Sequence, residues 1–158
     1  MKNIISALVI VVIIMVVNPG YADTSAVVVN ATVLSKSNCK FNSASTALNF
    51  GNLDPSNLID KSVSTSITFR CAGSAPNATF FISDNDGLYE TSPNANRMRH
   101  TTINTEYIPY EFTLNPTSGT VPKNSTQTLI ISGTVKGVAY KEAAAGNYSD
   151  RVIITLEP

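Results

Sequence analysis

Few residues of this chain have the type and spacing that catalysis or metal binding requires. The sequence of 158 residues contains one histidine, His100, which follows Arg99 in a polar stretch. Residues 84–87 read Asp-Asn-Asp-Gly, as in part of a calcium-binding loop, but Ile82 and Pro93 stand where that loop places carboxylates. An active site needs a poised acid, base, nucleophile or metal. We therefore interpret His100 as a surface histidine and residues 84–87 as a turn, and we expect neither an enzyme nor a cofactor.

The first 22 residues have the features of a secretory signal peptide. Lys2 precedes an apolar run at residues 4–17 that only Ser6 interrupts, and the stretch NPGYA that follows ends in the small residue Ala22. A membrane anchor is the alternative, but it needs roughly 18 or more apolar residues, and this run has 14 positions. We therefore expect cleavage after Ala22, export, and no direct membrane anchor in the mature chain.

Export determines how the two cysteines are interpreted. In an oxidising compartment a disulfide is favoured over a metal site or a reactive thiol, and two buried free thiols are the alternative. A bridge between Cys39 and Cys71 would close a loop of 32 positions. The chain-entropy treatment of such a loop gives roughly 3 to 4 kcal/mol of stabilisation. We expect this disulfide to form.

The charge of the mature chain argues against a polyanionic partner. Removal of Lys2 leaves ten basic against eleven acidic residues, a net charge near −1, and the basic residues form no run. Nucleic acids and anionic lipids are bound by clustered Lys and Arg side chains. We therefore expect neither as a partner, and residues 23–158 have the length of a single domain.

The mature sequence is predicted to be all-β. Thr, Ser, Val, Ile and Asn are abundant, Trp is absent, and no segment after Ala22 has a sustained apolar period near 3.6 residues. Short alternating runs lie between clusters of turn residues, and residues 83–105 are predicted to be a long surface connection. This pattern indicates an immunoglobulin-like sandwich. The predicted strands are residues 48–53, 63–71, 77–83, 108–114, 128–137 and 148–156.

The last predicted strand, residues 148–156, has no successor before Pro158. A seven-stranded sandwich in the usual order needs a final edge strand beside it. A missing edge strand leaves a groove that exposes core side chains and unpaired backbone groups. Val152, Ile154 and Leu156 alternate along the last strand and give it one wholly apolar face.

Several stretches between Cys39 and the carboxyl terminus form a recognisable series. They are LNFGNL after Cys39, then ITFRC, NRMRH, YIPYEF, LIISGTV and the final GNYSDRVIITLEP. The final stretch, with the pattern G-x-Y-S-D-x-V-x-x-T-L, is the most specific. Together they resemble the spore coat protein U domain, a family shared with subunits of archaic chaperone-usher pili. The resemblance covers nearly the whole mature chain.

The resemblance implies an incomplete immunoglobulin-like β-sandwich that lacks its last strand. In this family a periplasmic chaperone fills the groove first, and the amino-terminal segment of the next subunit then replaces it, which is a form of β-strand addition. An outer-membrane usher would then assemble the exported subunits into a surface pilus. Residues 23–36 would be the donor segment and residues 37–158 the pilin domain. The acceptor groove, and the edge that the chaperone pairs with, would carry Val152, Ile154 and Leu156.

The mature amino terminus has the alternation that a donor strand needs. Asn30 and Thr32 interrupt one face of residues 24–34, whereas the other face is apolar throughout. The residues of this apolar face would point into the groove of another copy or of a sister pilin: Val27, Val29, Ala31 and Val33.

Two functions are compatible with these observations. The resemblance favours a structural pilus subunit that supports adhesion and biofilm formation, and the length favours a shaft or adaptor subunit over a two-domain tip adhesin. Alternatively, residues 24–34 are the first strand of their own domain, because alternation does not say which sheet a strand joins. The protein would then be a monomeric secreted sandwich that binds a partner through residues 83–105.

Overall fold

The structure is a computed structural model that describes residues 27–32 and 37–158. The expected signal peptide, residues 1–22, and Val33 of the expected donor strand lie outside the described residues. The described residues fall into two parts, and each is described by itself. Residues 27–32 form no strand or helix, and the long part, residues 37–158, is all-β as the sequence predicts.

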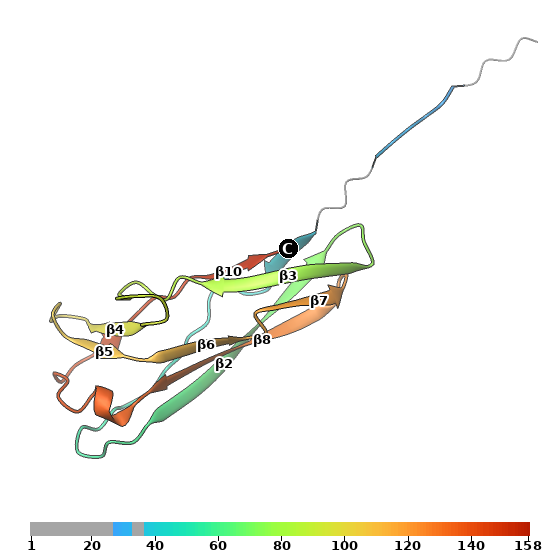
Figure 1. Cartoon of the computed structure of the whole chain (residues 1–158). Coiled ribbons are helices and arrows are strands. Elements are labelled where there is room, and N and C mark those ends of the chain that lie inside the picture. The colour runs from blue at the N-terminus through green and yellow to red at the C-terminus, as the bar shows by residue number, and fades with distance from the viewer. Residues whose placement is uncertain (1–26, 33–36) are drawn as a thin grey trace, which may run out of the picture. The chain divides into compact units, whose positions relative to one another are not determined.

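Residues 37–158 contain ten strands and one short 3-10 helix. They form three sheets, with the strand orders β1-β2-β8-β6, β10-β3-β7 and β5-β4-β9 (Figure 1). The elements are β1 (Asn38–Phe41), β2 (Lys61–Ala72), β3 (Asn77–Asp84), β4 (Arg97–His100), β5 (Tyr107–Pro109), β6 (Glu111–Asn115), β7 (Ser118–Pro122), β8 (Thr126–Val135), η1 (Gly137–Ala139), β9 (Tyr148–Ser149) and β10 (Ile154–Glu157).

The longest ladder joins β2 and β8, and its register follows from the alternation in both sequences. The strands pair antiparallel from Lys61 opposite Val135 to Arg70 opposite Thr126. Along β2 the positions that alternate inward are half-buried or buried, and Phe69 is fully buried. A shift by one residue would turn every one of these side chains to the other face, so the alternation fixes the pairing.

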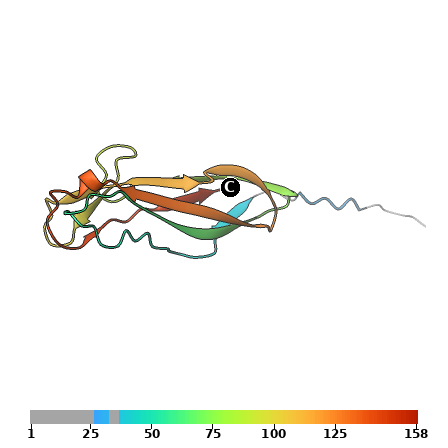
Figure 2. The ribbon, with the colours of Figure 1, turned by 90° about the horizontal axis from the view of Figure 1, so that it is seen from below.

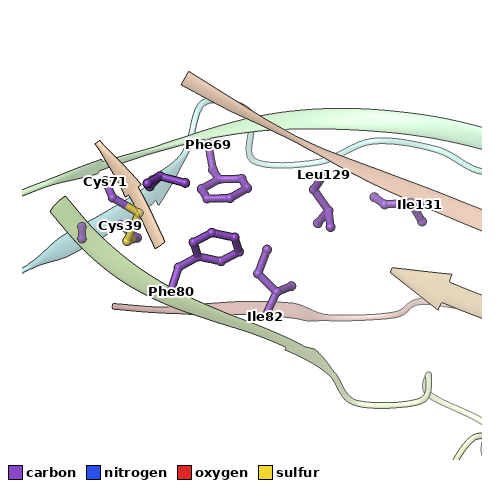
Figure 3. Packing of buried hydrophobic residues seen from close by; sticks show 9 residues of the cluster. Cys39, Phe69, Cys71, Phe80, Ile82, Leu129 and Ile131 are labelled. Atoms are coloured by element: carbon purple, nitrogen blue, oxygen red, sulfur yellow. A yellow bond between two sulfur atoms is a disulfide. The ribbon is translucent and has the colours of Figure 1, made fainter. Parts of the chain in front are cut away.

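The core lies between the sheets in two clusters. In the first, Phe69 of β2 and Phe80 of β3 meet edge to face, with ring centroids 4.9 Å apart (Figure 3). Buried residues of this first core cluster are Cys39, Phe69, Cys71, Ala78, Phe80, Ile82, Val121, Leu129 and Ile131. The second core cluster contains Ile108, Tyr110, Val135 and Tyr140. The two clusters together fill a sandwich.

The predicted strand at residues 48–53 is wrong. In Figure 2 the segment between β1 and β2 runs as a coil, and residues 42–60 form no strand. Gly51 has a φ of +69°, in the left-handed region, and its N–H donates to Asn49 Oδ1 at 2.8 Å. This local turn breaks the extended backbone that a strand requires.

The predicted surface connection at residues 83–105 is only partly correct, and the interpretation of His100 as a surface residue is wrong. This segment contains β4, and the His100 side chain is 4% exposed. Its Nδ1 accepts from the N–H groups of Thr102 at 3.1 Å and Ile103 at 3.0 Å, and its Nε2 lies 3.2 Å from the carbonyl oxygen of Ala145. A polar ring is buried here because each nitrogen has a backbone partner.

Two predicted strands are interrupted because the chain changes sheets within them. Residues 107–115 form β5, which pairs with β4, and then β6, which pairs with β8. Tyr110 stands at the change, and its N–H donates to the carbonyl oxygen of Asn96 at 3.0 Å. The terminal segment changes sheets in the same way, from β9 beside β4 to β10 beside β3. Alternation does not reveal such a change, since the side chains keep their period of two.

Candidate functional site

A groove of about 1030 Å³ runs between residues 43–55 and residues 143–154. It is at the upper end of the size range of ligand pockets, roughly 300 to 1,000 Å³. Both core clusters contribute residues to its walls, among them Ile131 of the first cluster and Tyr140 of the second. Its apolar lining includes Phe41, Phe50, Ile67, Met98, Ile108, Phe112, Ile131, Val152 and Ile154. Ile108 and Ile131 are buried, whereas the other side chains of this lining are half-buried, so the groove leaves part of their surface for a further strand to cover.

One side of the groove is the free edge of β10. This strand pairs with β3 only and stands at the end of the strand order β10-β3-β7. Just before it, the carbonyl oxygen of Ile153 accepts from the N–H of Asn85 at 3.2 Å, so the backbone of Ile153 faces the β3 side. Because backbone groups alternate along a strand, Val152 and Ile154 turn their N–H and C=O groups to the opposite, unpaired side. Such an edge is a template for another strand.

The three residues expected at the acceptor groove lie on the core side of the terminal segment. Val152 packs against the second core cluster, and Ile154 and Leu156 pack against the first. Val152 and Ile154 line the groove, whereas Leu156 is not among the residues that line it. All three are half-buried, and Ile153 between them is exposed.

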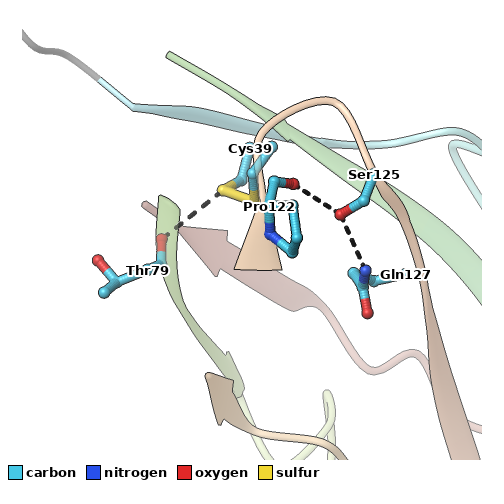
Figure 4. Close-up of a disulfide and its surroundings, with 6 residues drawn as sticks. Cys39, Thr79, Pro122, Ser125 and Gln127 are labelled. Carbon is cyan, nitrogen blue, oxygen red and sulfur yellow. Dashed lines mark hydrogen bonds between the residues drawn. A yellow bond between two sulfur atoms is a disulfide. The ribbon is translucent and has the colours of Figure 1, made fainter. Parts of the chain in front are cut away.

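The other side of the groove begins at β1, which pairs with β2 only. The structure contains the expected Cys39–Cys71 disulfide, which joins these two strands where Cys39 pairs with Cys71 (Figure 4). The Cys39 sulfur also lies 4.0 Å from the carbonyl oxygen of Thr79 on β3. The bridge therefore fastens the start of the groove to the first core cluster.

The residues expected to form the donor strand are exposed where the structure describes them. The exposed fraction is 83% for Val27 and 87% for Val29, and Ala31 is also exposed. The side chains expected to enter a groove are therefore exposed, and so is Val28 on the other face, at 79%.

Sequence reasoning missed a hydrogen-bonded brace beside the groove. Asp150 Oδ1 accepts from the N–H of Leu88 at 2.9 Å, and Asp150 Oδ2 accepts from the hydroxyl of Tyr110 at 2.8 Å. Burial, and then the hydrogen bond to Asp150, raise the pKa of Tyr110 above its usual range. The available signal was the Ser-Asp in the final stretch of sequence, but nothing in the sequence pairs it with Leu88 or Tyr110.

The Asp-Asn-Asp-Gly sequence forms a turn in which one side-chain oxygen each of Asp84 and Asn85 accepts from backbone N–H groups. Asp84 Oδ1 accepts from the N–H of Asp86 at 2.9 Å, and Asn85 Oδ1 accepts from the N–H groups of Gly87 and Ile153. Across residues 27–32 and 37–158, no three His, Cys, Asp or Glu side chains gather as metal ligands. The same residues contain no helix long and apolar enough to span a membrane.

Comparison with known proteins gives a family and a fold. The family model of the Spore Coat Protein U domain matches residues 23–155. A solved complex of a chaperone with the tip adhesion subunit of the archaic chaperone-usher Csu pili of Acinetobacter baumannii is similar, with 19% identity and a TM-score of 0.52. That match covers 77% of this chain but only 39% of the other chain. This likeness supports an immunoglobulin-like fold for this chain, as in such pilus subunits.

A second solved complex, of a chaperone with a tip adhesin of CFA/I fimbriae, is 15% identical with a TM-score of 0.49. The match covers 77% of this chain and 42% of the other. No curated protein matches the sequence.

Proposed function

The chain belongs to the spore coat protein U domain family, and we propose that it is a structural subunit of a surface pilus assembled by donor-strand exchange. The observation that carries this proposal is the groove of about 1030 Å³ beside the unpaired edge of β10. It offers both things that an added strand needs, which are free backbone groups and apolar positions for alternate side chains.

The amino-terminal segment has the chemistry to fill such a groove. From Val27 to Val33 an extended strand spans about 20 Å, at roughly 3.3 Å per residue. Its apolar face would cover half-buried groove residues such as Ile67 and Phe112, and its backbone would bond to Val152 and Ile154. We assign the donor segment that fills the groove to a second copy of this chain or to a sister pilin.

The pathway gives the remaining partners. An incomplete sandwich that exposes core side chains needs protection before assembly, since such surfaces aggregate. We assign this protection to a periplasmic chaperone that pairs with the edge of β10, and assembly at the cell surface to an outer-membrane usher. The similar solved complex of a chaperone with a pilus tip subunit supports the first partner. In the finished pilus the subunit would serve in the shaft or as an adaptor and support adhesion and biofilm formation.

A matched pair of substitutions tests the donor role. Val29→Asp places a charge on the apolar face, whereas Val28→Asp places the same charge on the face that already carries Asn30 and Thr32. Burial of a valine contributes about 1.5 to 3 kcal/mol, and an unpaired charge in an apolar site costs more. We expect Val29→Asp to give folded, unpolymerised subunits and Val28→Asp to give filaments, as seen by electron microscopy and size-exclusion chromatography of the exported chain.

Deletion of residues 23–34 tests whether this segment fills a groove at all, whereas a single stable monomer of the unchanged chain on size-exclusion chromatography would favour the alternative, a monomeric secreted binding domain. We expect the shortened chain to need an added peptide of residues 24–36 for stability. A monomeric remainder as stable as the whole chain without that peptide would show that the segment fills no groove. Filaments from both Asp variants would contradict the assignment of the donor face.

A further inference from the structure

Four residues of the groove edge lie outside any strand, and side-chain hydrogen bonds hold both ends of this segment. β9 ends at Ser149 and β10 begins at Ile154, so residues 150–153 belong to no strand. The β3–β10 ladder begins only where Ile154 stands opposite Asp84. Yet all four residues line the groove where the chain crosses from one sheet to the other.

Asn85 extends the ladder by one step with its side chain. Its backbone N–H donates to the carbonyl oxygen of Ile153 at 3.2 Å, as in an ordinary ladder. The return bond differs, because the N–H of Ile153 donates at 2.8 Å to Asn85 Oδ1 and not to a backbone carbonyl. The same Oδ1 accepts from the N–H of Gly87 at 3.2 Å, which fixes the Asn85 side chain within its turn. Ile153 is therefore held by both of its backbone groups.

Asp150 lies at the other end of residues 150–153, and its side chain is fixed by hydrogen bonds. Its two carboxylate oxygens accept from the N–H of Leu88 at 2.9 Å and from the hydroxyl of Tyr110 at 2.8 Å. Tyr110 is a buried member of the second core cluster, so the bond fixes Asp150 to the core. Gly87 has a φ of +95°, and a Cβ at this position would collide with the Asp150 carboxylate. The turn thus needs glycine both for its backbone and for the approach of Asp150.

We propose that Asn85 and Asp150 are positioning residues for the incoming strand. By holding the backbone of Ile153 and the carboxylate of Asp150 against the protein, these contacts leave the N–H and C=O groups of Val152 and Ile154 directed at the groove. The bound strand can then pair with a continuous edge from β9 to β10, although no ladder supports residues 150–153. This inference rests on the proposed donor-strand function and assigns a role in it to two motifs, Asp-Asn-Asp-Gly and Tyr-Ser-Asp.

Binding of a defined peptide to the exported full chain tests the inference. The probe is a fluorescent synthetic peptide of residues 24–36, and its dissociation rate is measured together with hydrogen exchange of backbone amides. Asn85→Ala removes the acceptor of the Ile153 N–H. We therefore expect the peptide to dissociate about tenfold faster, which corresponds to about 1.4 kcal/mol. The amides of Val152 and Ile154 should lose protection in the bound state, while that of Ile131 in β8 keeps it.

The neighbouring residue gives the matched control. Asp84→Ala removes a hydrogen bond within the same turn, from the N–H of Asp86, but no side-chain contact to residues 150–153. It should leave the dissociation rate within about twofold of the unchanged chain, well below the tenfold step. Asn85→Asp keeps a side-chain oxygen for Ile153 and should restore most of the binding. Asp150→Asn, a milder variant, should accelerate dissociation in the same direction.

The outcomes distinguish this inference from the function on which it rests. If the unchanged chain binds no peptide, the donor-strand function fails and the positioning role fails with it. If the unchanged chain binds and Asn85→Ala retains its rate and its amide protection, only the positioning role is overturned. Equal effects of Asp84→Ala and Asn85→Ala would also overturn it, because they would reflect the turn as a whole.

Discussion

The β2–β8 ladder and the terminal segment from β9 to β10 carry the same alternation of apolar side chains, but they are completed in different ways. β2 lies between β1 and β8, and β8 lies between β2 and β6, so both have a strand on each side. β10 has a partner on one side only, and residues 150–153 before it rely on Asn85 and Asp150.

The difference shows two ways in which the N–H and C=O groups of the backbone find hydrogen-bond partners. Within the ladder, backbone groups bond to one another, and the side chains only need to pack. At the edge, polar side chains replace a missing strand on one side, and the other side is left open for a strand from elsewhere. We therefore expect substitutions in the ladder to act on the folding of the subunit, and substitutions along the edge to act on assembly.

The largest effect should come from the ladder. Phe69 is fully buried and contacts the rings of Phe41 and Phe80, so Phe69→Ala leaves a cavity in the first core cluster. Such substitutions cost about 3 to 5 kcal/mol. Denaturant unfolding should show this loss with and without the donor peptide. Ile130→Ala, on the half-exposed outer face of the same ladder, is the control and should cost much less. Equal losses would contradict the assigned faces.

Loss of the disulfide should have the next largest effect, because the bridge joins β2 of the ladder to β1 on the other side of the groove. Replacing both Cys39 and Cys71 should lower the free energy of unfolding by about 2 to 5 kcal/mol. The pair should be replaced by Ser in one variant and by Ala in another, so that a buried hydroxyl is separated from the lost cross-link. Thermal unfolding and export yield measure the result. Normal yield and an unchanged melting temperature in the Ala variant would mean that the bridge contributes nothing.

The brace at the edge should give the smallest change in stability and a distinctive pH dependence. Tyr110→Phe keeps the ring but removes the hydrogen bond to Asp150, which should cost about 1.5 to 3 kcal/mol. Burial, and then Asp150, raise the pKa of Tyr110 above 10.0, so its contribution is complete below pH 10 and is lost as the pH rises beyond it. Denaturant unfolding between pH 8 and 12, roughly the range around the usual tyrosine pKa, should therefore be less steep in pH for Tyr110→Phe. An unchanged slope would remove Tyr110 from the brace.

Some of the candidate site could be predicted from residue types alone. Val152, Ile154 and Leu156 alternate with polar or exposed positions, and in the structure all three are half-buried against the core. The disulfide followed from the number of cysteines and the expected export. Asn85 and Asp150 could not be predicted in this way, since their partners are 68 and 62 positions away along the chain. A turn motif does not indicate which distant backbone group its side chain accepts from.

The sequence by itself determined the all-β class, the apolar face of Val152, Ile154 and Leu156, and the cysteine pair, because alternation and composition act locally along the chain. Only the tertiary structure decided that residues 42–60 form a coil, that His100 is buried, and that two strands change sheets at Tyr110 and at residues 150–153. The burial of His100 and the sheet changes depend on which segments become neighbours, as the bonds of His100 to Ala145 and of Ile153 to Asn85 show. Hydrophobic period fixes the direction of a side chain, whereas the presence of a strand beside an edge is fixed by topology.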